Sequence, residues 1–270
     1  MMNDTPCSSP FPLVAADVGN HRIKLGLFET DPEGNRHEPG CWLAIADAEP
    51  QLDRIAEWLS DRGREGLSWW IASVNRPAAT RLIDWLRSSR PKDRITLLAA
   101  GDLPLAVSVE RPDMVGIDRL LDAVAANHFR DPARPAIIVD LGSAITVDLV
   151  SAEGAFLGGV IMPGIAMSAR ALHEFTDLLP RIEMSELTTP PPPLGTSTVP
   201  AMRSGLFWGA VGAIRQLIDL LGDQVSGEPE VFLSGGAGPA VAGLLGRSTR
   251  HVPHLTLAGI TLTAQTQREA

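Results

Sequence analysis

The sequence predicts an α/β protein built from two similar lobes, each a mixed sheet flanked by helices. One observation is a repeated pattern, Asp-x-Gly-(Asn/Ser) between two apolar runs, which occurs at Asp17 and again at Asp140. A second observation is that strand-like segments alternate with amphipathic helical segments in both halves of the chain. The lobes are expected over residues 13–130 and 131–270, and residues 1–12 are expected to form a mobile N-terminal tail.

In the first lobe, Leu13–Phe28 predicts two strands, because apolar and β-branched residues lie on both sides of a turn at Gly19. The other elements expected there are strands at Cys41–Ala46, Trp69–Val74 and Val107–Val109 and helices within residues 52–59 and 80–87. A further helix is expected to begin at Asp118 and to end before Asp131–Pro135.

The second lobe is expected to repeat this plan. Its predicted elements are three successive strands within Ile137–Ile161, a helix at Ala166–Leu179 with Leu172, Phe175 and Leu179 directed inward, a helix at Ala201–Leu221 and a strand at Val231–Leu233. Between the two helices, Pro190–Pro193 favours extended polyproline geometry, because proline lacks the backbone N–H that a helix or a central strand needs.

Three glycines interrupt the helix predicted at Ala201–Leu221, at positions 205, 209 and 212. A glycine in a helix interior is less stable than alanine by about 1 kcal/mol. The glycines therefore predict tight contact with another backbone or with a ligand. The helix is either an interface element or part of the core.

The repeated turn has the chemistry of a phosphate-binding site. Glycine lets backbone N–H groups approach an anion, the Asn or Ser side chain adds a hydrogen bond, and an Asp at a strand end can hold a cation. An ordinary hairpin explains either turn alone, but their repetition favours two turns that bind one nucleotide triphosphate. The sequence contains no P-loop, G-x-S-x-G or H-E-x-x-H motif, and no G-x-G-x-x-G follows the first strand.

Further motifs follow these turns along the chain. In order, the set is Asp17-Val-Gly-Asn-His-Arg-Ile-Lys24, Gly116-Ile-Asp-Arg119, Asp140-Leu-Gly-Ser-Ala-Ile-Thr-Val-Asp148, Gly158-Gly-Val-Ile-Met-Pro-Gly164, Gly195-Thr-Ser-Thr198, Ser204-Gly205 and Ser234-Gly-Gly-Ala-Gly238. Their order and spacing resemble those of type III pantothenate kinases, over nearly the whole chain. The resemblance implies an actin-like (ribonuclease H-like) ATPase fold with a cleft between its lobes. It also implies ATP-dependent phosphorylation of pantothenate to 4′-phosphopantothenate, the first step of coenzyme A biosynthesis.

The resemblance also implies the position of ATP and its cations. The segment around the ATP phosphates would comprise Asp17, Val18, Gly19, Asn20, His21, Arg22, Ile23 and Lys24, and Ser143 would also contact ATP. A monovalent cation, K⁺ or NH₄⁺, would bind at Asp140, and Mg²⁺ would bind the ATP phosphates near Asp17. Relatives usually have Thr in place of His21 and Ser143. Lys24 is either a phosphate contact or an exposed strand residue.

Asp118 is expected to cap the N-terminus of its helix and, by the resemblance, to be the catalytic residue that accepts the hydroxyl proton. Such a base need not be strong, because phosphoryl transfer depends mainly on positioning and charge neutralisation. The implied pantothenate-binding residues are Gly116, Ile117, Asp118, Arg119 and Thr198. Arg119 is either a clamp for the charge of the substrate or a partner in a helix-surface ion pair. Ser234–Gly238 either lines the adenosine pocket or is a plain strand-to-helix turn.

One position departs from the pattern of the family. Relatives commonly carry a substrate-contacting Tyr nine residues before the catalytic Asp, whereas this chain has Val109 there and contains no Tyr. One alternative is therefore a kinase of the same fold that acts on another small hydroxyl substrate. A second is a non-catalytic nucleotide-binding regulator, although such a protein has no need of the Asp118 carboxylate.

Composition restricts the partners. The formal net charge of −9 argues against nucleic acid or an anionic membrane as a partner. No apolar run approaches the roughly 20 residues that span a bilayer, residues 1–12 do not form a signal peptide, and Cys7 and Cys41 indicate no disulfide framework. A cytoplasmic enzyme is expected, and the resemblance implies a homodimer whose interface helps to shape the pantothenate pocket.

His251 and His254 are either a metal-binding pair or surface residues.

Overall fold

The structure is a computed structural model, and it describes residues 11–29, 37–46, 52–60, 65–183, 189–246 and 248–269. Most of the predicted N-terminal tail lies outside the described residues. No helix in these described ranges is long and apolar enough to cross a membrane.

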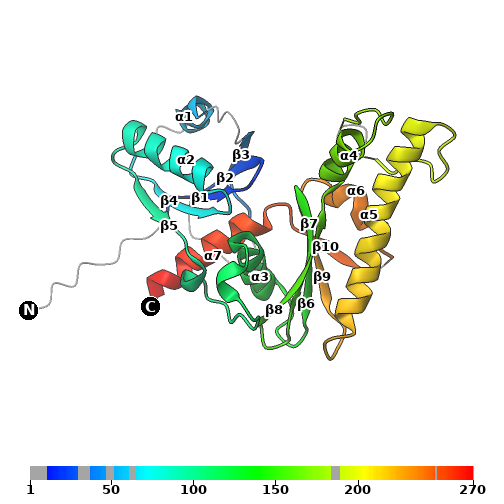
Figure 1. The fold of residues 1–270 in the computed structure, drawn as a ribbon. Helices are drawn as coiled ribbons and strands as arrows, with labels where there is room; N and C mark the ends of the chain where they lie inside the picture. Colours follow the sequence, from blue (N-terminus) through cyan, green and yellow to red (C-terminus); the bar gives the residue numbers. More distant parts are fainter. Residues whose placement is uncertain are drawn as a thin grey trace, which may run out of the picture. The chain divides into compact units, whose positions relative to one another are not determined.

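The first sheet has the strand order β3-β2-β1-β4-β5 (Figure 1). Its strands are β1 (Leu13–Val18), β2 (Arg22–Phe28), β3 (Cys41–Ala46), β4 (Ser68–Ser73) and β5 (Arg94–Leu97). The central strand β1 pairs antiparallel with β2 and parallel with β4. The predicted hairpin at the first Asp-x-Gly turn is therefore present, and a parallel strand completes the mixed sheet.

The second sheet has the strand order β8-β7-β6-β9-β10, which repeats the order of the first sheet strand for strand. Its strands are β6 (Ala136–Leu141), β7 (Ala144–Val150), β8 (Phe156–Pro163), β9 (Glu230–Ser234) and β10 (Thr249–His251). The central strand β6 pairs antiparallel with β7 and parallel with β9. The prediction of two similar mixed sheets is confirmed.

The helices lie between and after these strands. They are α1 (Asp53–Ser60), α2 (Arg76–Ser89), α3 (Ile117–Phe129), α4 (Ile165–Glu174), α5 (Thr198–Gly222), α6 (Gly238–Ala242) and α7 (Leu255–Glu269), with two short 3-10 helices at Ala100–Asp102 and Pro112–Met114. The predicted helix at Ala166–Leu179 is shorter than expected, and the one at Ala201–Leu221 is longer.

Each central strand directs its acidic residue away from the main core of its sheet. In β1, Val14, Ala16 and Val18 pack in a core with α1 and α2, and strand alternation places Asp17 on the other face. In β6, Val139 and Leu141 pack in a core with α5, which places Asp140 on the other face. The repeated sequence pattern therefore produces a repeated placement of the carboxylate.

The chain divides into two compact units. One comprises residues 1–105, 113–125 and 254–270, and the other comprises residues 106–112 and 126–253. The C-terminal helix α7 thus belongs to the unit of the first sheet, where it contacts β1 and β4. At Gly259 of α7, an added Cβ would lie 2.1 Å from the backbone oxygen of Leu121, so α7 and α3 meet backbone to backbone.

Two predictions about local structure are wrong. Val107–Val109 is no strand of the first lobe: Val107 forms an isolated parallel bridge with Phe156 of β8, in the second unit. Phe175 is not directed inward, because α4 ends one residue before it and its side chain is 84% exposed. A Cβ added at position 205, 209 or 212 of α5 meets no atom of another described segment within 4 Å. Contact of these glycines with a ligand or with a second chain stays a prediction.

Candidate active site

The first Asp-x-Gly turn places a carboxylate and an ammonium group face to face. Asp17, which is buried, lies directly opposite Lys24 in the β1–β2 ladder, and Lys24 Nζ is 3.7 Å from Asp17 Oδ2. The turn is closed by the Gly19 N–H, which donates to the Arg22 oxygen over 3.0 Å. Among the predicted ATP-binding residues, Val18 and Ile23 are fully buried, so they support the turn from within the core.

The start of α2 supports this turn. The Val74 N–H donates to the Val18 oxygen over 3.1 Å, and Asn75 Nδ2 lies 3.5 Å from the Gly19 oxygen. Asn75 also caps α2, since its Oδ1 accepts the Ala78 N–H over 3.2 Å. Asn75 is not among the residues predicted from the sequence, although an Asn followed two residues later by Pro is a helix-start signal.

Gly116 lies close to Val74, which precedes the start of α2, and Asp118 lies next to Gly116. A Cβ added to Gly116 would be 3.7 Å from Val74 Cγ1, and 2.5 Å from Asp118 Oδ1. The structure corrects the predicted N-cap, because α3 begins at Ile117 and Asp118 lies within its first turn. Asp118 Oδ1 instead accepts the N–H of Arg119 over 2.9 Å. The orientation of this carboxylate depends on the missing side chain at Gly116.

The second Asp-x-Gly turn is one residue shorter than the first. Asp140 lies opposite Thr146, whereas the equivalent partner of Asp17 is Lys24. The Gly142 N–H donates to the Ala144 oxygen over 3.1 Å, and a Cβ at Gly142 would be 3.1 Å from Asp140 Oδ2. The two turns therefore share the carboxylate and the glycine, but only the first supplies a lysine at the opposite position.

Two further segments pack closely on the second turn. The Gly164 N–H, at the start of α4, donates to the Ser143 oxygen over 3.1 Å. Gly235 has a positive φ of 87°, and a Cβ there would lie 2.5 Å from the Leu141 oxygen. Ser234, which is buried, is the parallel partner of Asp140. The structure thus brings Asp140, Ser143 and the Gly-rich turn after β9 to one edge of the second sheet.

The Gly-rich turn also contacts β10. A Cβ at Gly238 would be 2.7 Å from His251 Nε2, so the His251 ring occupies the space that a side chain there would need. His254 has different surroundings, with its ring 5.2 Å from that of Trp42. Among the described residues, no group of three or more His, Cys, Asp or Glu could hold a metal ion. The rings of His251 and His254 thus pack against different segments.

Thr198 is exposed at the first residue of α5. Gly195 packs directly under the start of that helix, since a Cβ there would lie 2.2 Å from the Ala201 nitrogen. The proline run lies along the same helix: Ser204 Oγ donates to the Pro193 oxygen over 2.6 Å, and Trp208 Nε1 donates to the Pro191 oxygen over 2.9 Å. Prolines offer only acceptors, and α5 supplies the donors.

A family model described as type III pantothenate kinase matches residues 13–220. A type III pantothenate kinase from Acidiphilium cryptum (strain JF-5) is 35% identical over 261 residues, which cover 92% of each chain. Another from Koribacter versatilis (strain Ellin345) is 37% identical over 264 residues, which cover 92% of this chain and 93% of the relative.

Among solved structures, a putative 2-dehydro-3-deoxygalactonokinase protein from Sinorhizobium meliloti matches with a TM-score of 0.56. The match covers 94% of this chain and 99% of the other, at 14% sequence identity. At that identity the likeness concerns the fold alone. Together with the two mixed sheets of equal strand order, it confirms the predicted actin-like α/β ATPase fold.

Proposed function

Because this chain belongs to the type III pantothenate kinase family, we propose that it uses ATP to phosphorylate pantothenate to 4′-phosphopantothenate, the first step toward coenzyme A. The observation that carries this proposal is the repeated Asp-x-Gly turn, which ends the central strand of both sheets within the residues matched by the family model. Such turns present backbone donors and a carboxylate, the groups that a phosphate chain with its cations needs.

Asp118 is the proposed proton acceptor. The primary hydroxyl oxygen of pantothenate attacks the γ-phosphorus of ATP, the bond from that phosphorus to the bridging oxygen breaks to give ADP, and the hydroxyl proton passes to the Asp118 carboxylate. The N–H of Arg119 fixes one carboxylate oxygen, which leaves the other for the substrate. Because the transition state is loose, this orientation matters more than basicity.

The two turns are proposed to bind the ATP phosphates. Lys24 supplies a positive charge, Asn20 supplies polar groups and Ser143 supplies a hydroxyl. Gly19 shapes the loop, because its N–H and its oxygen are already bonded to Arg22 and Asn75. Asp140 has a hard carboxylate oxygen of the kind that binds a monovalent cation such as K⁺ or NH₄⁺. Asp17 is proposed to lie near Mg²⁺ held by the phosphates. The cations would neutralise charge that develops on the transferred phosphoryl group.

Pantothenate is proposed to contact Gly116, Ile117, Asp118, Arg119 and Thr198, with the Arg119 guanidinium directed to the substrate carboxylate. Val109, at the position where relatives carry Tyr, lies beside β8: a Cβ at Gly158 would be 3.5 Å from Val109 Cγ1. A Val there contributes no hydroxyl to the substrate. A panel of small hydroxyl acceptors compared with pantothenate tests whether this position broadens the choice of substrate.

We further propose that the protein is cytoplasmic and forms a homodimer through α5. The exposed glycines of that helix leave room for a second helix to approach closely, and Phe175, Leu178 and Leu194, in the segments between α4 and α5, are each at least 80% exposed. Their apolar surface would be covered by a partner copy. A molar-mass measurement in solution tests this, with Gly209→Leu expected to weaken the dimer. A wild-type protein of one-chain mass at micromolar concentration contradicts it.

The proposed reaction is tested by ADP release. We expect ADP to form only when pantothenate is added, and faster with K⁺ or NH₄⁺ than with Na⁺ alone. ADP release that is independent of pantothenate, or that needs another acceptor, contradicts the proposal. ATP binding without turnover on any acceptor would instead support a regulator.

A further inference from the structure

Helix α3 carries the proposed proton acceptor at one end and is held by an arginine at the other. Asp118 lies in its first turn, and Phe129 is its last residue. An α-helix rises 1.5 Å per residue, so these two positions are about 16 Å apart along the axis. In a continuous helix, a displacement of the C-terminal end also moves the first turn.

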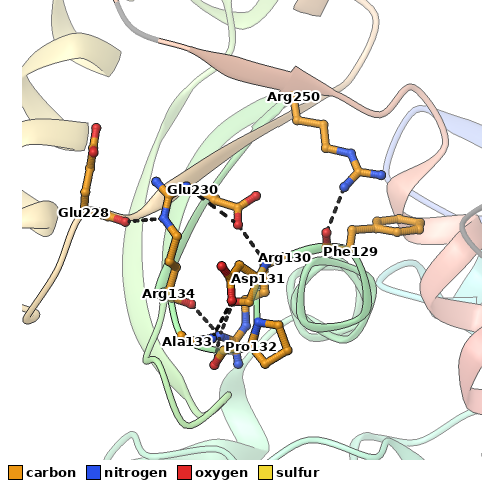
Figure 2. A network of polar contacts seen from close by, with 9 residues as sticks. All are labelled: Phe129, Arg130, Asp131, Pro132, Ala133, Arg134, Glu228, Glu230 and Arg250. Atoms are coloured by element: carbon orange, nitrogen blue, oxygen red, sulfur yellow. Dashed lines mark hydrogen bonds and ion pairs between the residues drawn. The ribbon is translucent and has the colours of Figure 1, made fainter.

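Arg250 contacts the C-terminal end of α3 (Figure 2). Its Nη1 donates to the backbone oxygen of Phe129 over 2.8 Å, and its guanidinium carbon lies 5.0 Å from the centre of the Phe129 ring. The last carbonyl groups of a helix lack intrahelical partners and carry a partial negative charge. The guanidinium satisfies one of these oxygens and also packs on the ring of the same residue.

The position of Arg250 is fixed by the second sheet. It lies on β10 opposite Phe232 of β9, and its guanidinium carbon is 5.8 Å from the centre of the Phe232 ring. Phe232 in turn pairs with Ile138 of β6, two residues before Asp140. Arg250, Phe232 and Ile138 therefore lie side by side across three neighbouring strands, and Ile138 is on the strand that carries Asp140.

The other contacts at this end have a different character. Arg130, which is buried, donates from Nη1 to the oxygens of Asp131, Pro132 and Arg134, and from Nε to Asn127 Oδ1. These bonds stay within α3 and the loop that follows it. Asn127 Nδ2 donates to the Gly154 oxygen over 2.7 Å, in the β7–β8 connection. The N–H of Asp131, two residues after the end of α3, donates to Glu230 Oε1 on β9 over 2.7 Å, so the loop is also joined to the sheet. Arg250 differs because it bonds the last carbonyl group of α3 itself to a parallel strand of the sheet.

We propose that Arg250 is a positioning residue for the reaction: it fixes the C-terminal end of α3 against the second sheet and so sets the position of the helix that carries Asp118. This inference rests on the proposed role of Asp118. Small misplacements of a catalytic group have large effects, since about 1 Å can reduce a rate by about 100-fold. Arg250 should therefore affect turnover without contacting substrate.

The test compares Arg250→Gln with Arg134→Gln in the full-length protein. Arg134 is the control, because its Nε also donates to a backbone oxygen, that of Glu228, over 3.0 Å, and its Nη1 lies 3.9 Å from Glu230 Oε1 (Figure 2). Its guanidinium thus joins the loop after α3 to the segment at the start of β9, whereas that of Arg250 bonds a carbonyl group of α3 itself. Steady-state ADP release is measured against both substrates at a temperature where circular dichroism shows both variants to be folded. For R250Q we expect kcat to fall about tenfold or more, with KM for ATP and pantothenate within about threefold of wild type. R134Q should keep kcat within about twofold.

A purely stabilising role would lower the melting temperature of R250Q and leave its kcat equal to that of R134Q, and that result overturns the proposal. A rise in KM with unchanged kcat also overturns it. If R250Q does not fold, Arg250→Lys is measured instead, because lysine keeps the positive charge without the planar guanidinium. A kcat reduced about threefold or more in this variant supports the proposal, and a wild-type kcat overturns it. Failure of the proposed function is seen separately, as absence of pantothenate-dependent ADP release in the wild type.

Discussion

The Asp118 carboxylate occupies the space beside the α-carbon of Gly116, where a Cβ would stand 2.5 Å from Oδ1. The same oxygen accepts the Arg119 N–H. The proposed proton acceptor is thus oriented by a backbone donor on one side and by the absence of a side chain on the other. The Gly116-Ile-Asp-Arg119 motif therefore needs glycine at its first position to leave space for the Asp118 carboxylate, in addition to its proposed role in substrate binding.

Gly116→Ala should reduce turnover while preserving the fold. The added methyl group would collide with a carboxylate that can rotate, so the structure adapts by moving Asp118 away from its orientation. We expect kcat to fall about tenfold, the order of loss that follows from misorienting a catalytic group, and the melting temperature to change little. Gly101→Ala is the control, because a Cβ there meets no atom within 4 Å. Unchanged kcat in Gly116→Ala would show that the carboxylate orientation is not needed.

Asp118→Asn should leave folding intact and lower kcat by about 100-fold or more, the range expected for loss of a positioned base. Asparagine keeps the shape and can still accept the Arg119 N–H through its oxygen, so only proton acceptance and charge are lost. Single-turnover ADP formation and a thermal melt measure the two effects. Near-wild-type turnover in this variant refutes the proposed role.

Lys24→Met should weaken ATP binding much more than it weakens the fold. Lys24 Nζ is 3.7 Å from Asp17 and its side chain is 37% exposed, and ion pairs with such exposure contribute at most about 1 kcal/mol to stability. A lost phosphate contact worth about 1.4 kcal/mol raises KM for ATP about tenfold. The matched control is Lys92→Met, since the chain has two lysines and Lys92 pairs with the exposed Glu65. Equal KM values for ATP in the two variants would show that Lys24 is an exposed strand residue and not a phosphate contact.

Gly259→Ala should destabilise the first unit. The added Cβ would lie 2.1 Å from the Leu121 oxygen and 2.7 Å from its carbonyl carbon, and backbone atoms cannot rotate away as a side chain can. Overpacking of this kind lowers the free energy of unfolding by about 1–3 kcal/mol. Urea unfolding compared with Gly101→Ala measures the difference. An unfolding midpoint equal to that of the control would mean that α7 and α3 are not in backbone contact.

Local patterns predicted most elements of the structure. The Asp-x-Gly turns at Asp17 and Asp140 were identified from glycine and β-branched residues, which determine short-range conformation, and both hairpins are present. Predictions failed where a segment had too little pattern of its own. Val107 and Val109 look like a strand by composition, but Val107 bridges to Phe156, far along the chain, and no local signal specifies that pairing.

The sequence by itself determined the α/β class, the repeated acidic turn and the set of motifs that place the chain in its family, because each depends on residue type at short spacing. Only the tertiary structure decided that α7 packs with the first sheet, that Gly116 makes room for Asp118, and that Arg250 reaches the end of α3. These contacts depend on how whole elements pack and on the exact direction of side chains, which no local periodicity specifies.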